Sequence, residues 1–189
     1  IADFVISQQN ENGGFRGRPW GLRWTEKSTL VDSYHAVRTL LGLGRPVPRS
    51  AALIEFVRSR QRADGAFLQD LYPERAGVCA QTSQAVSILD ALGAEMPRRA
   101  DVIAFLHRMQ SGNIRRDGGF IAEDTPEWEE LVRAARRWAK SVHPYRDPGP
   151  DDTRAIPIAV GYTSATDLAI RALSLLGDRP RDVPGALAF

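Results

Sequence analysis

Residues 105–120 read FLHRMQSGNIRRDGGF, and residues 4–15 and 56–67 repeat the same phrase. The phrase consists of a Phe, a Gln five residues later, and a Gly-rich turn that ends in a second Phe. Its glutamines recur at intervals of 52 and 49 residues, as Gln9, Gln61 and Gln110. A period near 50 residues indicates a repeat protein, in which each repeat is one supersecondary unit packed against its neighbours.

A second phrase lies between the copies of the first. Each copy is a Leu-rich segment at helical spacing, with an Ala eight residues before a closing Gly, and Gly commonly ends helices. The pairs are Ala36 with Gly44, Ala85 with Gly93, and Ala169 with Gly177. This spacing predicts helices over residues 30–43, 78–92 and 162–176.

The first phrase marks the ends of another set of helices, over residues 1–9, 50–61 and 97–110. Ser50 is the expected N-cap of the middle helix, because its hydroxyl can accept a bond from a free backbone N–H. Strand signals are almost absent from the chain. We therefore expect an all-α protein built from antiparallel helix pairs.

The repeat pattern is interrupted before the last copy of the second phrase. Thr125-Pro126-Glu127 is a typical helix start, and the helix that it begins should end near Lys140. Residues 142–161, which hold four Pro, indicate irregular structure. We expect a single domain over residues 1–189 with an insertion at about 121–158.

The composition is that of a soluble globular protein, with 43% hydrophobic and 25% charged residues. No apolar run approaches the length of a membrane span, and Cys79 is the only cysteine. A cytoplasmic location is therefore expected. The net charge of +2 is too small to indicate a nucleic-acid partner. The first residue is Ile1, midway through a repeat, so we expect a fragment or a processed chain.

The Gln-to-Phe turn, followed by a helix with an Ala and a closing Leu-Gly, resembles the repeat of the prenyltransferase and squalene-cyclase (terpenoid cyclase) family. It is most similar to the β subunits of protein prenyltransferases, because its turns end in Phe where triterpene cyclases usually have Trp. Residues 13–35, GGFRGRPWGLRWTEKSTLVDSYH, carry the likeness most clearly. The resemblance covers the chain outside roughly 121–158.

The resemblance implies an α/α toroid, in which inner helices line a central funnel and outer helices surround them. The helices over 30–43, 78–92 and 162–176 would be inner ones. The Gln, Gly and Phe of the first phrase would then be structural, because they bond helix ends, permit a positive-φ turn and fill the space between layers. A full toroid has about six helix pairs and this chain supplies about three. We therefore expect a homo-oligomer or a partner chain to complete the ring.

The resemblance also implies an isoprenoid diphosphate or polyprenyl ligand in an apolar funnel. The N-termini of inner helices suit a diphosphate, because they offer free N–H groups and a positive dipole. The predicted catalytic residues lie at the start of the first inner helix: Asp32, Tyr34 and His35. The predicted substrate-binding residues are Arg16, Arg18, Trp20, Arg23, Trp24, Lys27, Cys79 and Tyr162. The alternative is a basic surface loop, with Asp32 as a helix cap.

The family's cofactor pattern is only partly present. In protein prenyltransferases an Asp and a Cys of this stretch bind zinc. Asp32 matches the Asp, but the Cys position beside it holds Tyr34 unless a gap is allowed. The missing Cys argues against zinc, Mg²⁺ remains open, and a lone cysteine such as Cys79 is more often a small buried residue. Cyclases use an Asp-x-Asp-Asp acid, and Asp151-Asp152 lacks its leading Asp.

These observations leave two functions open. One is a terpene cyclase or prenyltransferase type of enzyme, with His35 as a base or a diphosphate partner. The other is a non-catalytic toroid module that serves lipid binding or protein assembly.

Overall fold

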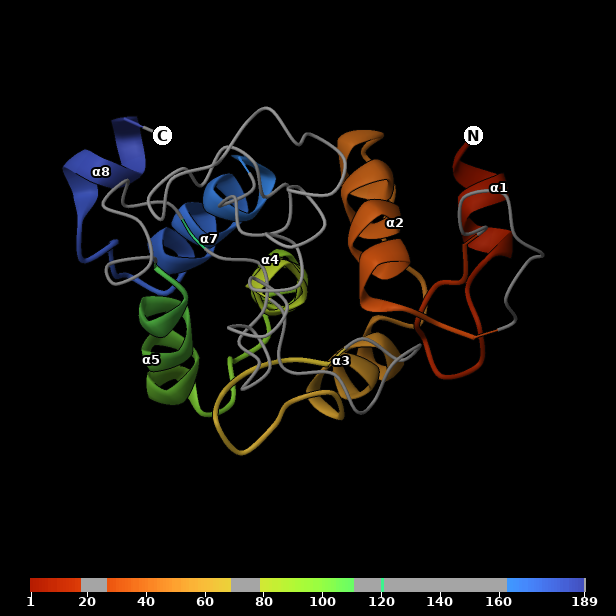
Figure 1. The fold of residues 1–189 in the computed structure, drawn as a ribbon. Helices are drawn as coiled ribbons and strands as arrows, with labels where there is room; N and C mark the ends of the chain where they lie inside the picture. Colours follow the sequence, from red (N-terminus) through yellow and green to blue (C-terminus); the bar gives the residue numbers. More distant parts are fainter. Residues whose placement is uncertain (18–26, 69–78, 111–119, 121–162, 189) are drawn as a thin grey trace, which may run out of the picture.

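The computed structural model describes residues 1–17, 27–68, 79–110, 120 and 163–188 (Figure 1). Every regular element in this part is an α-helix, as the repeat pattern predicts. The helices are α1 (Ala2–Ser7), α2 (Leu30–Gly42), α3 (Ser50–Arg58), α4 (Cys79–Ala91), α5 (Arg99–Met109), α7 (Thr163–Leu175) and α8 (Val183–Ala188).

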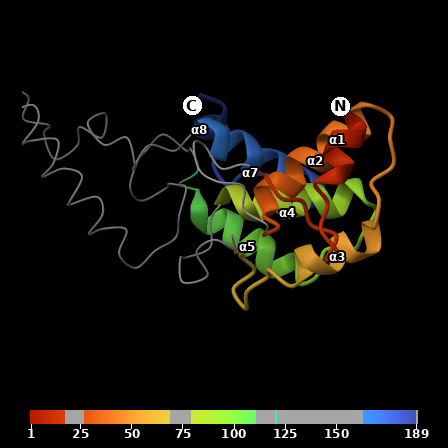
Figure 2. The same cartoon turned by 90° about the vertical axis from the view of Figure 1, so that its right-hand side faces the viewer.

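The helices form two layers with α4 at the centre. Helix α4 packs against α2 on one side and α7 on the other, while α3 and α5 pack against it from below (Figures 1 and 2). Helix α1 packs against α2. The inner helices are therefore α2, α4 and α7, which agrees with the toroid arrangement. Across the described residues, no helix is long and apolar enough to cross a membrane.

Each inner helix ends at the Gly of the second phrase. Gly44, Gly93 and Gly177 have φ values of 66°, 65° and 65°. The residue after each Gly donates its N–H to a carbonyl in the last turn of the helix, as in the bond from Arg45 to Leu40 at 2.9 Å. This is the usual glycine stop, in which only a residue without a Cβ adopts the left-handed conformation freely.

The Phe of each turn connects one layer to the other. Phe15, Phe67 and Phe120 are buried, and the backbone N–H of each donates to a hydroxyl on the following inner helix. The acceptors are Ser33 at 2.9 Å, Thr82 at 3.0 Å and Thr166 at 3.0 Å. These hydroxyls lie three residues before the Ala of the second phrase, so they belong to the repeat as well.

The Gln of each turn binds the segment that leads into the following outer helix. The side-chain amides of Gln9, Gln61 and Gln110 donate to the carbonyls of Pro48, Pro97 and Asp182. These bonds span 39, 36 and 72 residues of sequence. The prediction that the Gln bonds backbone at a helix end is confirmed, and the bond also sets the spacing of neighbouring outer helices.

Two details of the prediction were wrong. Ser50 is the first residue of α3 and not its cap, because Arg49 takes the N-cap position with φ 45° and gives no side-chain capping bond. Helix α8 was not predicted, because its short segment contains Pro184 and Gly185, which are poor helix formers. The predicted helix from Thr125 and the insertion lie outside the described residues.

Candidate functional site

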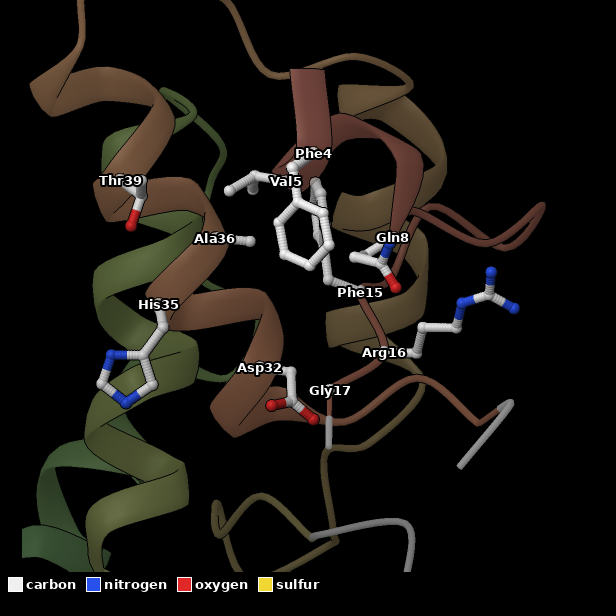
Figure 3. A pocket seen from close by; sticks show the side chains of 10 residues that line it. All are labelled: Phe4, Val5, Gln8, Phe15, Arg16, Gly17, Asp32, His35, Ala36 and Thr39. Carbon is white, nitrogen blue, oxygen red and sulfur yellow. The ribbon is translucent and has the colours of Figure 1, made fainter. Parts of the chain in front are cut away.

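An open pocket of about 240 Å³ lies between α1, α2 and the turn that follows Phe15 (Figure 3). Its floor is apolar and includes Val5 and Ala36, while its rim is polar. The lining residues are Phe4, Val5, Gln8, Phe15, Arg16, Gly17, Asp32, His35, Ala36 and Thr39. Two predicted catalytic residues and one predicted binding residue therefore meet in one pocket: Asp32, His35 and Arg16.

Asp32 is held in place at the start of α2. Thr29 is the N-cap residue, and its hydroxyl accepts from the Asp32 N–H at 3.0 Å while donating to the Asp32 carboxylate at 2.6 Å. The first bond satisfies the free N–H of Asp32 at the helix end, and the second fixes the Asp32 carboxylate beside the cap. The backbone of Gly17 lies against the same carboxylate, since a Cβ at that position would come within 2.0 Å of Oδ1. Asp32 thus takes part in helix capping, as the alternative interpretation predicts, although Thr29 is the cap itself.

His35 and Tyr34 differ in exposure although they are neighbours. His35 is exposed on the pocket rim, while Tyr34 is buried. Their rings meet edge to face with centroids 5.2 Å apart. The Tyr34 hydroxyl accepts a hydrogen bond from Arg38 at 3.1 Å, and the Arg38 guanidinium also lies 5.7 Å from the ring centroid. Tyr34 thus links the pocket rim to a cationic side chain that the sequence did not single out.

The cationic residues of the first loop are only partly described. Arg16 is half-buried, and its guanidinium points away from Asp32 (Figure 3). Lys27 is exposed, two residues before Thr29. The remaining predicted binding residues of this loop and of the last inner helix lie outside the described part: Arg18, Trp20, Arg23, Trp24 and Tyr162.

Cys79 lies in the core at the start of α4. It is fully buried, and burial raises the pKa of its thiol to about 12, partly offset by a hydrogen bond with Ser83. At neutral pH it is therefore a protonated thiol without access to a ligand. This burial argues against Cys79 as a substrate-binding residue and favours its interpretation as a small packing residue.

The side chains of the site do not make up a zinc-binding set. Zinc sites in proteins have at least three protein ligands. No group of three or more His, Cys, Asp or Glu side chains gathers in the part of the chain that the structure describes. Asp32 and His35 alone are too few ligands for this metal.

Sequence reasoning assigned Phe4 to the scaffold only, yet it lines the pocket. Phe4 is 60% exposed, while its counterparts Phe56 and Phe105 are 5% and 0% exposed. The repeat pattern could not distinguish the three positions, because the same residue occupies each one. Gln8 and Thr39 also line the pocket and were not predicted. Gln8 lies beside the Phe of the turn and Thr39 lies on α2, and only the structure shows these positions.

The family is shown by a direct comparison. The model of the prenyltransferase alpha-alpha toroid domain matches residues 1–127 of this chain, whereas no curated protein matches it. The matched part includes the pocket, α1 to α5 and all three copies of the first phrase. With its inner and outer helix layers, its Gln-to-Phe turns and this match, the chain belongs to the prenyltransferase alpha-alpha toroid domain family.

Proposed function

We propose that this protein binds a prenyl diphosphate or polyprenyl chain in an apolar funnel and that it transfers or cyclises that chain. The observation that carries the proposal is the pocket at α1 and α2, whose floor is apolar and whose rim holds Asp32 and His35. Arg16 and Gly17 in its wall begin the cationic stretch of residues 16–27. Membership of the prenyltransferase toroid family supports the same class of ligand.

The electrostatics of α2 decide how a diphosphate would be held. The Thr29 hydroxyl already accepts from the Asp32 N–H at the N-terminus of α2 and donates to the Asp32 carboxylate. That carboxylate repels an anion there. Cationic side chains must therefore supply the binding energy. Arg18 matches the Arg of the family pattern, while Lys27 is shifted relative to its Lys because this loop is longer. A Mg²⁺ ion at Asp32 would reverse the repulsion, since carboxylate and phosphate oxygens are its preferred ligands.

The proposed reaction needs few groups. In transfer, the bond between the prenyl carbon and diphosphate oxygen breaks, and its electron pair leaves with the diphosphate. Nearby cations stabilise that charge. His35 is exposed and can take up the proton that is released when the prenyl carbon bonds to its acceptor or when a cyclised cation loses a proton. Tyr34 is assigned the role of holding the diphosphate through its hydroxyl.

The test is a thermal-unfolding screen with farnesyl and geranylgeranyl diphosphate, each with and without Mg²⁺ or Zn²⁺. We expect at least one prenyl diphosphate to raise Tm, because a ligand that binds only the folded state stabilises it. The paired substitutions Arg18→Ala and Lys27→Ala should remove most of that rise. The matched control is Arg45→Ala, an exposed arginine whose carboxylate partner Asp3 is 3.4 Å away.

Two outcomes contradict this assignment. If no prenyl diphosphate raises Tm, the isoprenoid function is wrong. If the Arg18→Ala and Lys27→Ala variant binds as well as the parent while Arg45→Ala does the same, the ligand is held elsewhere.

The second candidate function is protein assembly, and the exposure of Phe4 favours it. In the second repeat the equivalent Phe56 is covered by the Gly turn of the repeat before it, since a Cβ on Gly14 would come within 3.0 Å of the Phe56 ring. The α1–α2 face thus offers the surface that a further helix pair covers in the rest of the fold. We propose that copies of this chain assemble into a homo-oligomer through the α1–α2 face.

Light scattering tests that candidate. Self-association through the face predicts a mass above that of the 20.9 kDa chain, and Phe4→Ser should lower it. A monomer at high protein concentration, or an oligomer that Phe4→Ser leaves unchanged, excludes this face as the contact.

A further inference from the structure

The first Gly-rich turn differs from its two later copies at three polar positions. Residues 12–15 read NGGF, whereas residues 64–67 and 117–120 read DGAF and DGGF, so an Asn stands where the other copies have Asp. One residue after the Gln of the phrase, the first repeat has Asn10 where the others have Arg or Ser. Eight residues before the Ala of the second phrase, it has Ser28 where the others have Gly.

These three side chains form one hydrogen-bonded network. The Asn10 amide donates to the Ser28 hydroxyl at 2.9 Å, and that hydroxyl donates to the Asn12 side-chain oxygen at 2.8 Å. The same oxygen accepts the backbone N–H of Gly14 at 3.0 Å. Ser28 is 3% exposed, and a Cβ on Gly14 would come within 2.5 Å of the Ser28 Cβ. We call Asn10, Asn12 and Ser28 the asparagine–serine network, which joins the turn to the segment that enters α2.

The asparagine–serine network holds the segment that carries two groups of the proposed site. Lys27 precedes Ser28 and Thr29 follows it. The Thr29 N–H donates to the Phe15 carbonyl at 3.0 Å, so the backbone of this segment is also bonded to the turn. The Thr29 hydroxyl in turn donates to the Asp32 carboxylate at 2.6 Å. These bonds connect the network to the carboxylate that lines the pocket (Figure 3).

The second repeat makes the same turn with a charged side chain. Asp64 accepts the N–H of Ala66 at 3.2 Å and forms an ion pair with Arg62 at 3.3 Å. An Asp at the position of Asn12 would therefore keep the turn bond. It would also place a second carboxylate near the pocket that already holds Asp32, where the proposed ligand is an anion. The neutral amide provides the acceptor without that added repulsion.

We propose that the asparagine–serine network positions the pocket between α1 and α2 for an anionic ligand. It fixes the segment that carries Lys27 and Thr29, and Asn12 supplies the acceptor oxygen without a negative charge. The network residues act through Lys27 and Asp32 and are not assigned a contact with the ligand. This inference rests on the proposed function, because the neutrality of the network matters only where an anion binds.

The experiment is a calorimetric titration of the full chain with farnesyl diphosphate, in the presence and absence of Mg²⁺. Asn12→Asp keeps the hydrogen bonds but adds a charge, so it should weaken binding about threefold or more. The loss should be larger at an ionic strength of about 0.01 M than at about 0.1 M, because the Debye length falls from about 30 Å to about 10 Å. A merely structural role of Asn12 predicts no such salt dependence.

The charge-matched control is Ala100→Glu, which adds a carboxylate at an exposed position of α5. Because α5 lies away from α1 and α2 (Figure 1), this variant should change the affinity less than about twofold.

Ser28→Ala tests the positioning itself. It removes the hydroxyl that joins the two asparagines, so the amide hydrogens of Thr29 and Asp32 should exchange with solvent about tenfold faster in the ligand-free protein. The affinity of this variant for farnesyl diphosphate should fall as well. Asn12→Asp should keep the slow exchange of the parent, because its carboxylate can accept the same bonds.

The outcomes separate this inference from the proposed function. Slow exchange with weaker, salt-dependent binding in Asn12→Asp, together with fast exchange and weaker binding in Ser28→Ala, supports the network. If the parent binds farnesyl diphosphate and both variants bind it as tightly, the positioning role is wrong while the isoprenoid function stands. Equal losses for Asn12→Asp at both ionic strengths also overturn the inference. If the parent binds no prenyl diphosphate, the proposed function and this inference fail together.

Discussion

At the scale of single residues, hydroxyl groups join the two helix layers. Ser33, Thr82 and Thr166 each accept from the backbone N–H of a buried Phe. Without that acceptor, the N–H would be buried without a partner, which costs more than an ordinary hydrogen bond is worth. Each turn therefore depends on a polar side chain that lies later in the sequence than its Phe, by 18, 15 and 46 residues.

This dependence gives the first prediction. Thr82→Val keeps the shape of the side chain but leaves the N–H of Phe67 without an acceptor, so the free energy of unfolding should fall by about 1–3 kcal/mol. Thr82→Ser keeps the hydroxyl, as Ser33 does in the first repeat, and should lose clearly less. Urea denaturation of both variants measures the difference, and equal losses would show that the hydroxyl does not matter.

The second prediction concerns Cys79. Its pKa is raised from 9.0 in the unfolded chain to about 12 in the folded protein. The unfolded state therefore releases the proton first, and the thiol's contribution to stability is complete below pH 9.0 and is lost as the pH rises toward 12. Between these values the wild type should lose more stability than Cys79→Ala does. Chemical denaturation at several pH values measures this difference. If the free energies of unfolding of the two proteins change with pH in the same way, the effect is refuted.

At the scale of elements, the Gly of the first phrase sets how closely one repeat approaches the next. Gly65 has φ 89°, and a Cβ on it would come within 2.3 Å of the Asp101 backbone at α5. Gly93, which follows α4, has φ 65°, and a Cβ added to it would meet no atom within 4 Å. Both glycines have left-handed backbone, but only Gly65 also packs against another helix.

The third prediction compares these two glycines. Gly93→Ala should cost about 1–2 kcal/mol, the strain of a left-handed residue with a Cβ. Gly65→Ala should cost at least about 2 kcal/mol more, because α5 must also move away. Thermal or chemical unfolding gives both values. A similar loss for the two variants would mean that the approach of the turn to α5 is not tight.

Element positions were largely predictable from the sequence, because a repeated pattern adds evidence at each copy. The inner helices were predicted within about one residue at the described ends, since Gly44, Gly93 and Gly177 stop them through local backbone conformation. Ser50 was misassigned because capping depends on the conformation of Arg49, and a positive φ at an arginine has no sequence signal. Helix α8 was missed because neighbours, rather than propensity, stabilise it, as the bonds from Arg181 and Asp182 to Gln110 indicate.

At the scale of the whole molecule, the candidate site was only partly predictable. The basic stretch and Asp32 stood out by residue type, and the pocket does bring Asp32, His35 and Arg16 together. Phe4 did not stand out, because its significance lies in its exposure. A pattern that marks equivalent positions cannot show which of them a neighbour covers.

The proposed function requires that the apolar chain of a prenyl diphosphate contributes to binding in addition to the diphosphate group. Calorimetric titration of the full chain with geranylgeranyl diphosphate and with inorganic diphosphate separates these two contributions. Burial of the chain should make the prenylated ligand bind at least about tenfold more tightly, since each buried CH₂ contributes about 0.8 kcal/mol. Equal affinity for the two ligands, or no binding of the prenylated one, would contradict the account.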